Sequence, residues 1–332
     1  ADAIFIDELR AADWYEKLFA LDAKHSGSSA AIFSAALFRS ALGQWEQSIK
    51  DYQQYITAYP DKPNINGINI EIARIYEKHD RFAEASKVYL GFYSKPPVNA
   101  TIGEIMFCRL RYGLLMDKIN LGAKVNQHWK DSLAFLEDQK KKGADVSEGM
   151  EAAAQMMFIL SEAQFQSYMN MKIDGPGDKK VPQKQADKML LEQLRAKTKA
   201  LAELEATYVN IVGTGAGEWG LASLTRLGQA YENMAESFLK SWIPSYLTED
   251  QKEIYTMTLQ DKAFPQIEKA VAAYSQALSK GFELSLYNDN TAFAARRLGE
   301  LRPKEFPGLF ETIPEVRRSA PSVYNASFET QP

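Results

Sequence analysis

Cysteine is nearly absent from this chain of 332 residues, which contains a single one, Cys108. No disulfide can form within the chain, so cysteine pairing says nothing about the redox compartment. The apolar neighbours of Cys108 favour a buried small side chain over a reactive nucleophile. Histidine is scarce too, because His25, His79 and His128 lie far apart and none has a second ligand at zinc-site spacing. We therefore expect no metal site.

The sequence also lacks long apolar runs and an excess of basic residues. No stretch approaches the roughly 18 to 20 apolar residues of a membrane-spanning helix. Lys and Arg number 39 against 43 Asp and Glu, a net charge of −4, which argues against a strongly basic nucleic-acid binder. The glycine-rich run 213–218 lacks the Lys-Ser/Thr pair of a nucleotide-binding loop. No spacing among the carboxylates marks an acid/base pair. We expect no cofactor, no nucleic acid and no enzymatic activity.

A spacing of 37 residues is present through the first hundred positions. A small residue recurs at this spacing, followed four positions later by an aromatic residue and seven positions later by a large apolar one. The three sets are Ala11, Ser48 and Ala85; Tyr15, Tyr52 and Tyr89; and Leu18, Tyr55 and Phe92. Positions i, i+4 and i+7 share one face of a helix, so each copy predicts a helix with the same buried stripe. A preceding helix in the second and third copies indicates stacked helix pairs, because one pair cannot cover its own apolar face.

These residues resemble the tetratricopeptide repeat (TPR) family. The best copy has a large residue and a small one in the first helix, an aromatic residue at the turn and a closing proline. Its matching positions are Ile72, Ala73, Tyr76, Phe82, Ala85, Tyr89 and Pro97. A late copy begins with the L-G-x-x-Y run 227–231 and continues, after an insertion, with Ala270, Tyr274 and Ala277. The pattern departs from the family at Tyr55 and Phe92, which replace a small residue, and in its period, which exceeds the family's 34.

The predicted fold class is all-α, a right-handed α-solenoid of stacked helix-turn-helix repeats. Helices are expected over 101–118, 124–142, 147–170, 185–212 and 289–301, with 185–212 the longest. A capping box at Thr248 predicts a short helix, and Phe264-Pro265 predicts the start of another. The expected regions are N-terminal repeats 1–172, a loop or linker 173–184, a C-terminal repeat region 185–302 with an insertion 236–262, and an extended proline-rich tail 303–332.

The start of the chain resembles half of a repeat. Residues 4–24 match a second helix, and the first helix of that pair is missing. An array that opens on half a pair exposes an apolar stripe unless a cap covers it. We therefore hypothesise that this chain is a fragment or processed form of a longer protein, in which case a missing signal peptide is uninformative.

In the resembled family the first helices line a concave groove that contacts an extended peptide or partner helix. The resemblance places these candidate contact residues here: Ile70, Arg74 and Glu77; Phe33 and Leu37; and Thr225, Gln229 and Glu232. The Lys and Asn of the family's clamp for C-terminal carboxylates are not reproduced, which disfavours a chaperone-tail receptor. Alternatively, Phe33 and Leu37 contact a neighbouring helix, and Arg74 forms a surface ion pair.

Two functions are compatible with these observations. The first is a non-catalytic scaffold that binds a protein or extended peptide through its groove, insertion or tail. The second is an accessory helical domain of a larger envelope enzyme or transport machine whose catalytic part is absent from this chain. The C-terminal third resembles envelope repeat proteins of gliding and predatory deltaproteobacteria, which take part in motility or envelope assembly. That resemblance implies a periplasmic location, with a cytoplasmic one as the alternative. The sequence indicates no oligomeric state.

Overall fold

The computed structural model describes residues 2–177 and 181–307, and these residues form helices without any β-strand. The prediction of an all-α chain is confirmed. The helices are α1 (Asp2–Leu21), α2 (Ser28–Ala41), α3 (Trp45–Ala58), α4 (Ile65–Lys78), α5 (Phe82–Ser94), α6 (Ile102–Leu115), α7 (Val125–Lys141), α8 (Met150–Asn170), α9 (Gln183–Gly213), α10 (Gly217–Leu239), α11 (Glu249–Glu283) and α12 (Asp289–Leu301). Single 3₁₀ turns, Gly122–Lys124 and Ser147–Gly149, precede α7 and α8.

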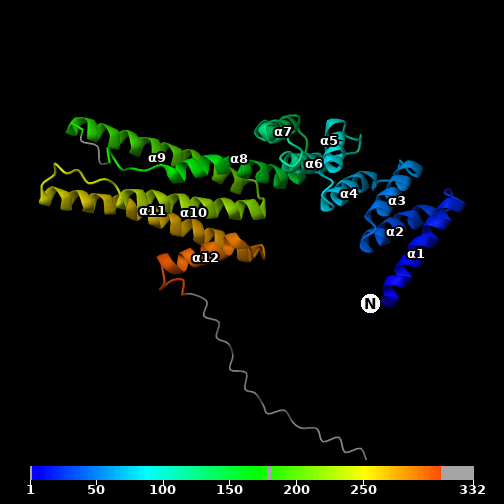
Figure 1. The fold of residues 1–332 in the computed structure, drawn as a ribbon. Helices are drawn as coiled ribbons and strands as arrows, with labels where there is room; N and C mark the ends of the chain where they lie inside the picture. Colours follow the sequence, from blue (N-terminus) through cyan, green and yellow to red (C-terminus); the bar gives the residue numbers. More distant parts are fainter. Residues whose placement is uncertain (1, 178–180, 308–332) are drawn as a thin grey trace, which may run out of the picture.

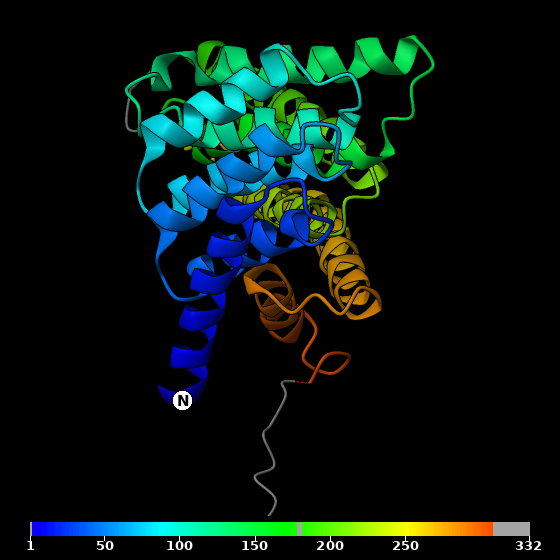
Figure 2. The same cartoon turned by 90° about the vertical axis from the view of Figure 1, so that its right-hand side faces the viewer.

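The helices stack as hairpins that contact their neighbours along the chain. The pairs are α2/α3, α4/α5, α6/α7, α8/α9 and α10/α11, while α1 packs on α2 and α12 on α10 and α11. First helices of successive pairs also touch, as α6 does with α8 and α8 with α10. In Figure 1 the short early hairpins lie beside a layer of long helices, and Figure 2 shows the same stack from its N-terminal side. This nearest-neighbour stacking of helix pairs confirms the predicted α-solenoid.

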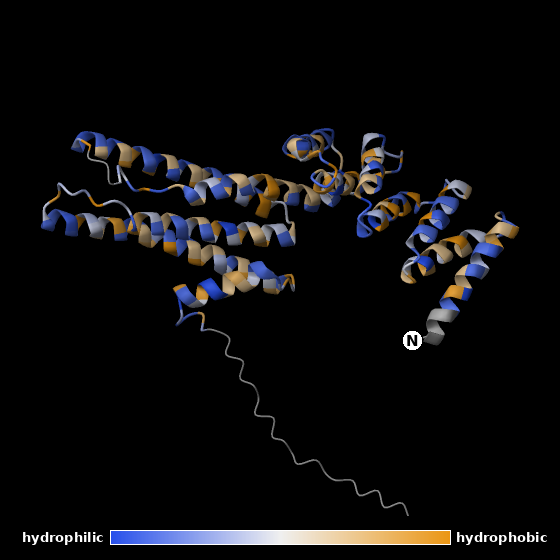
Figure 3. Cartoon of the chain, in the orientation of Figure 1, coloured by the Kyte–Doolittle hydropathy of each residue, from blue (hydrophilic) through white to orange (hydrophobic). Residues whose placement is uncertain are grey.

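The repeating small-aromatic-apolar stripe is the core of the early hairpins. Ala85, Tyr89 and Phe92 are buried in one cluster with Ile70 and Ala73 of the preceding helix. One hairpin earlier, the cluster repeats with the side chains Tyr52, Tyr55, Ile32, Ala36, Ile68 and Ile72. Figure 3 shows hydrophilic and hydrophobic residues mixed along the helices, as expected for helices that bury one face. Cys108 is fully buried in the first of these clusters, and burial raises the pKa of its thiol to about 12.

The L-G-x-x-Y run is buried where α10 meets α11. Gly228 lies so close to the Tyr274 ring that a Cβ at this position would overlap it. Ala230, Ala270 and Ala277 complete the contact in the largest core cluster of the described residues. The small residues of the motif therefore allow the two helix axes to approach around the tyrosine.

Three sequence predictions about the extent of helices are wrong, and one of them is that the helix at the Thr248 capping box is short. The longest described helix is α11, with 35 residues, and not α9, which has 31. A new helix does not begin at Phe264-Pro265, because α11 starts at the Thr248 capping box and continues through Pro265. Pro265 costs the helix one hydrogen bond, and the capped first turn and the strong helix formers that follow keep the preceding residues helical. Helix α12 begins as predicted, since the Asn288 side chain accepts hydrogen bonds from the Asn290 and Thr291 amides.

The segment after α8 packs against its surroundings where it is described. Ile173 is buried, and the Gly175 amide donates to Gln193 Oε1 at 2.8 Å. The predicted tail is described as far as residue 307, and Phe306 packs against the largest core cluster. The rest of the tail that was expected to be extended, residues 308–332, lies outside the described residues. None of the described helices is long and apolar enough to cross a membrane.

Candidate functional site

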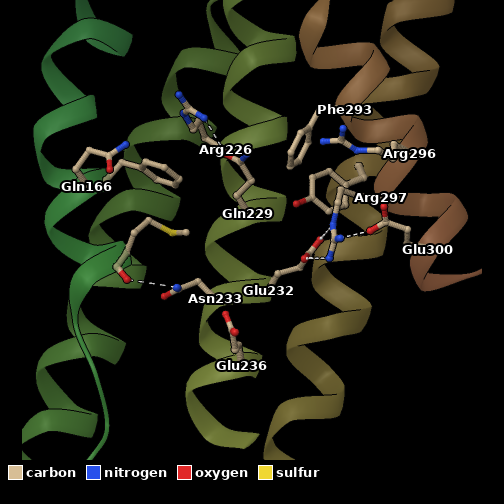
Figure 4. A pocket seen from close by; sticks show the side chains of 13 residues that line it. Gln166, Arg226, Gln229, Glu232, Asn233, Glu236, Phe293, Arg296, Arg297 and Glu300 are labelled. Carbon is tan, nitrogen blue, oxygen red and sulfur yellow. Dashed lines mark hydrogen bonds and ion pairs between the residues drawn. The ribbon is translucent and has the colours of Figure 1, made fainter. Parts of the chain in front are cut away.

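A hollow of about 520 Å³ lies where the first helices of successive hairpins, α8 and α10, meet α12. We call it the C-terminal hollow, and Figure 4 shows its lining. Helix α11 contributes Tyr274, and the other lining side chains come from α8, α10 and α12. The lining residues are Phe165, Gln166, Met169, Arg226, Gln229, Glu232, Asn233, Glu236, Tyr274, Phe293, Arg296, Arg297 and Glu300.

Helix α10 presents a polar ridge to this hollow. Gln229, Glu232, Asn233 and Glu236 are spaced at i, i+3, i+4 and i+7, which places them on one helical face. The opposite face of α10 is apolar and buried, so the ridge cannot rotate inward. Two of the residues predicted from the sequence, Gln229 and Glu232, therefore line the same hollow.

Ion pairs tie the three helices together at the hollow. Arg226 of α10 donates from Nε and Nη2 to the two carboxylate oxygens of Glu162 on α8, both at 2.9 Å. Its Nη1 donates to Gln229 Oε1 at 2.8 Å. Arg297 of α12 makes the same forked contact with Glu232 of α10, with Nε at 3.1 Å from Oε1. Forked guanidinium–carboxylate contacts fix orientation as well as distance.

The same arrangement recurs in the N-terminal half. Glu77 of α4 accepts hydrogen bonds from Arg111 Nε of α6 at 3.1 Å and from the Tyr89 hydroxyl of α5 at 3.2 Å. Tyr208 and Tyr274 occupy the corresponding second helices at the other two pairs, near Glu162 and Glu232. Burial raises the pKa of Tyr208 to about 12. Each set therefore joins a glutamate on a first helix to an arginine on a following helix, with a buried tyrosine of the second helix nearby, and of these tyrosines only Tyr89 donates a hydrogen bond to its glutamate. We call such a set an inter-hairpin clamp.

Three charged groups of the hollow, Glu236, Arg296 and Glu300, lie outside the clamps, and Glu300 pairs with Arg297. Arg296 is exposed on α12, with its guanidinium 5.2 Å from the centroid of the Phe293 ring, and has no carboxylate partner among the described residues. Glu236 forms an exposed ion pair with Lys240, which contributes little stability. Arg296 on one wall and Glu236 on the other are thus the charges most accessible to a bound molecule.

A buried lysine supports the floor of the hollow. Lys197 of α9 is fully buried, and its Nζ donates to Met171 O and Asn233 Oδ1, both at 2.5 Å. Desolvation lowers the pKa of its ammonium group to about 8. The lysine therefore joins the end of α8 to the ridge of α10. Sequence analysis missed this residue because it lies in a run of helix-forming Lys, Glu and Ala that resembles a solvated face.

The structure separates the other predicted contact residues. Ile70 is buried among Ala73, Ala85 and Tyr89, and Thr225 is buried with its hydroxyl donating to Leu221 O at 3.1 Å. Neither side chain is accessible from the groove. Glu77 belongs to a clamp, with 15% of its side chain exposed.

Arg74 is half exposed on α4. It pairs with Glu71 at 3.5 Å, and its guanidinium covers the Phe107 ring at 4.7 Å. This contact is the surface ion pair that the sequence left open as an alternative.

Phe33 and Leu37 line a second hollow, of about 620 Å³, between α2 and α4. Phe33 also packs against the rings of Tyr52 and Tyr55, with centroids 5.9 and 5.6 Å away, so it contacts a neighbouring helix as well. Leu37 has 48% of its surface exposed. No group of His, Cys, Asp and Glu side chains in the described ranges could hold a metal ion.

Comparison with known proteins gives a distant structural likeness. No protein-family model and no curated protein matches the sequence. Among solved structures, BtubC from P. vanneervenii is 12% identical, covering 86% of this chain and 92% of its own, with a TM-score of 0.38. A tetratricopeptide repeat protein from Parabacteroides merdae is 12% identical, covering 89% and 92%, with a TM-score of 0.35.

Proposed function

We propose that this TPR-like solenoid is a non-catalytic scaffold that binds an extended segment of a partner protein in the C-terminal hollow. The observation that carries the proposal is the polar ridge of α10 facing an open hollow between α8 and α12. Hydrogen-bonding side chains that converge on a concave surface suit a polypeptide, which offers backbone donors and acceptors along its length.

The clamps favour binding by holding the hollow in shape. Glu162–Arg226 and Glu232–Arg297 fix α8, α10 and α12 relative to one another before any ligand arrives. A preorganised surface loses less conformational entropy on binding. Gln166 and Gln229 then provide amides for a peptide backbone, and Met169 and Phe293 provide apolar contact.

Site-specific photocrosslinking in the native host tests this proposal. The photoreactive residue p-benzoylphenylalanine replaces Gln166, which is exposed in the hollow, or Lys199, which is exposed on α9 outside it. We expect a discrete protein adduct from position 166 and none of the same mass from position 199. Mass spectrometry identifies the partner. Identical adducts at both positions, or none at 166, would rule out the hollow as the binding surface.

The alternative function is an accessory domain of an envelope enzyme or transport machine whose catalytic part is absent from this chain. Purified protein incubated with peptidoglycan or with nucleotides should show no turnover under either function. Reproducible turnover would contradict both, because each assigns no catalysis to this chain.

A periplasmic place within an envelope complex is the finer form of our proposal. It is supported by the resemblance of the C-terminal third to envelope repeat proteins. Fractionation of the native host should recover the protein with periplasmic markers, and recovery with cytoplasmic markers would contradict this location.

A further inference from the structure

Arg109 of α6 is held between two aromatic rings. Its guanidinium carbon lies 4.7 Å from the centroid of the Tyr93 ring on α5 and 4.5 Å from that of Phe135 on α7. Stacking on two ring faces keeps the guanidinium group in a fixed plane. None of these residues lines the C-terminal hollow.

Other partly buried arginines of this chain are neutralised by carboxylates. Arg39, Arg111, Arg226, Arg297 and Arg302 each pair with an aspartate or glutamate. Arg109 forms no ion pair and donates no side-chain hydrogen bond within 2–177 and 181–307, and its Nε is buried without an acceptor. Among the partly buried arginines of the described residues, Arg109 is therefore held by aromatic rings and the others by carboxylates.

The groups around Arg109 leave its charge uncompensated. Burial lowers the pKa of the guanidinium, and Tyr93 and Asp131 oppose this shift electrostatically. Asp131 is exposed and accepts a hydrogen bond from Gln127 at 2.8 Å. An uncompensated charge in a partly dry site costs free energy, which an arriving anion recovers.

His128 on α7 is the other titratable base in this cluster. Its Nε2 lies 2.7 Å from Arg109 O, and burial lowers its pKa below the ordinary 6.5, so the ring is neutral at pH 7. The rings of Tyr93 and Tyr112 also belong to this cluster and pack edge to face, with their centroids 5.7 Å apart. Arg109 is thus the one cation of this cluster at neutral pH, within the described residues.

We propose that Arg109 binds the carboxylate of an acidic side chain from a partner protein, with Tyr93 and Phe135 contacting the apolar atoms beside it. The planar fork of a guanidinium matches a carboxylate in two parallel hydrogen bonds. A small free anion should bind Arg109 more weakly than a protein carboxylate does, because a single cation without a second cation beside it attracts an anion only weakly in water. Arginine and aromatic side chains together are the residue types enriched at protein interfaces. This surface is independent of the C-terminal hollow.

Nuclear magnetic resonance of the arginine side chains tests this inference directly. In protein labelled with ¹⁵N-arginine, the Arg109 Nε–H signal is recognised by its ring-current displacement and by its loss in Arg109→Lys. Hexaglutamate should shift this signal, and the change in chemical shift should saturate at a peptide concentration of about 1 mM. Hexaglutamine should leave it unchanged. No shift with hexaglutamate would overturn the proposal.

A third titration, with inorganic phosphate, separates the two possible sources of the anion. If phosphate saturates the signal at concentrations as low as the peptide requires, Arg109 is a simple anion site and the proposed protein contact is wrong. We expect the saturating concentration of phosphate to be about tenfold higher than that of hexaglutamate, or more, because phosphate gains no apolar contact with Tyr93 and Phe135.

Variants complete the test. Arg109→Lys keeps the charge without the planar fork and should weaken hexaglutamate binding by about tenfold, measured by fluorescence anisotropy of labelled peptide. Arg195→Lys makes the same substitution at an exposed arginine on α9 and serves as the matched control, with unchanged binding. Equal weakening by both variants would mean that the peptide responds to any arginine of the surface and not to this site.

Discussion

At the scale of single residues, Lys197 shows how tertiary contacts reverse the usual place of a lysine. A lysine in a helix rich in Lys and Glu is normally exposed. Here the ammonium group is fully buried and bound to the carbonyl of Met171 and the side chain of Asn233. It satisfies a carbonyl left free beyond the end of α8, as cations near helix C-termini do.

The buried ammonium predicts a pH dependence of stability. Its folded pKa, about 8, lies below the ordinary 10.5, so between these values the unfolded chain binds more protons and stability rises with pH. From pH 7.5 to 9.5 the free energy of unfolding of the wild type should rise relative to Lys197→Met by about 2 kcal/mol. Urea denaturation at both pH values measures this difference. Lys199→Met, an exposed lysine of the same helix, should run parallel to the wild type. If Lys197→Met also runs parallel, the lowered pKa is wrong.

At the scale of elements, the TPR-like motif is explained by the contact between α10 and α11. Gly228 is required because Tyr274 occupies the space of a side chain there. Gly220 lies eight residues earlier in α10. A Cβ added there would lie 3.7 Å from Val212 Cα, which is an ordinary van der Waals contact. A side chain is therefore sterically excluded at Gly228 and sterically allowed at Gly220.

This difference gives a matched pair of variants. Gly228→Ala should lower the free energy of unfolding by about 1–3 kcal/mol, because the methyl group forces Tyr274 or the helix to move. Gly220→Ala should be neutral or raise it by up to about 1 kcal/mol, through helix propensity. Thermal and urea denaturation of both variants check the expectation. Equal effects would show that helix propensity, and not the tyrosine contact, decides the outcome.

Helix α11 shows why element boundaries were harder to predict than elements. Local sequence signals at Thr248 and Pro265 each indicate a helix start, and only the first is one. Every buried residue of α11 lies at or after Ala263, so packing on α10 is confined to its second part. A proline inside a helix is tolerated when the turns before it have their own cap and the turns after it are held by tertiary contacts.

At the scale of the whole molecule, the inter-hairpin clamps connect one hairpin to the next. Core clusters bury the apolar stripes, and the clamps add polar contacts between successive first helices at Glu77–Arg111, Glu162–Arg226 and Glu232–Arg297. In a solenoid each repeat is stabilised by its neighbours, so such contacts link stability along the array.

A double-mutant cycle measures one clamp. Glu232→Gln and Arg297→Met should each destabilise the protein, with a coupling energy of about 1–2 kcal/mol, because about 20% and 29% of these side chains is exposed. The exposed pair Glu236–Lys240 on the same helix is the control, and its coupling should stay below about 0.5 kcal/mol. Equal coupling in the two cycles would contradict a special role for the clamp.

The sequence by itself determined the helices, the repeating hairpin and its buried stripe, because helical periodicity and small-aromatic spacing are local properties of the chain. It also predicted Gln229 and Glu232 as contact residues from their place in the motif, and both line the C-terminal hollow. Only the tertiary structure decided that Ile70 is buried, that Lys197 lies inside and that Arg109 lacks an acid partner. These outcomes depend on which hairpins meet, and residues 34 to 65 positions apart form the clamps. No local pattern specifies such distant pairs, since their contact follows from the pitch of the stacked helices.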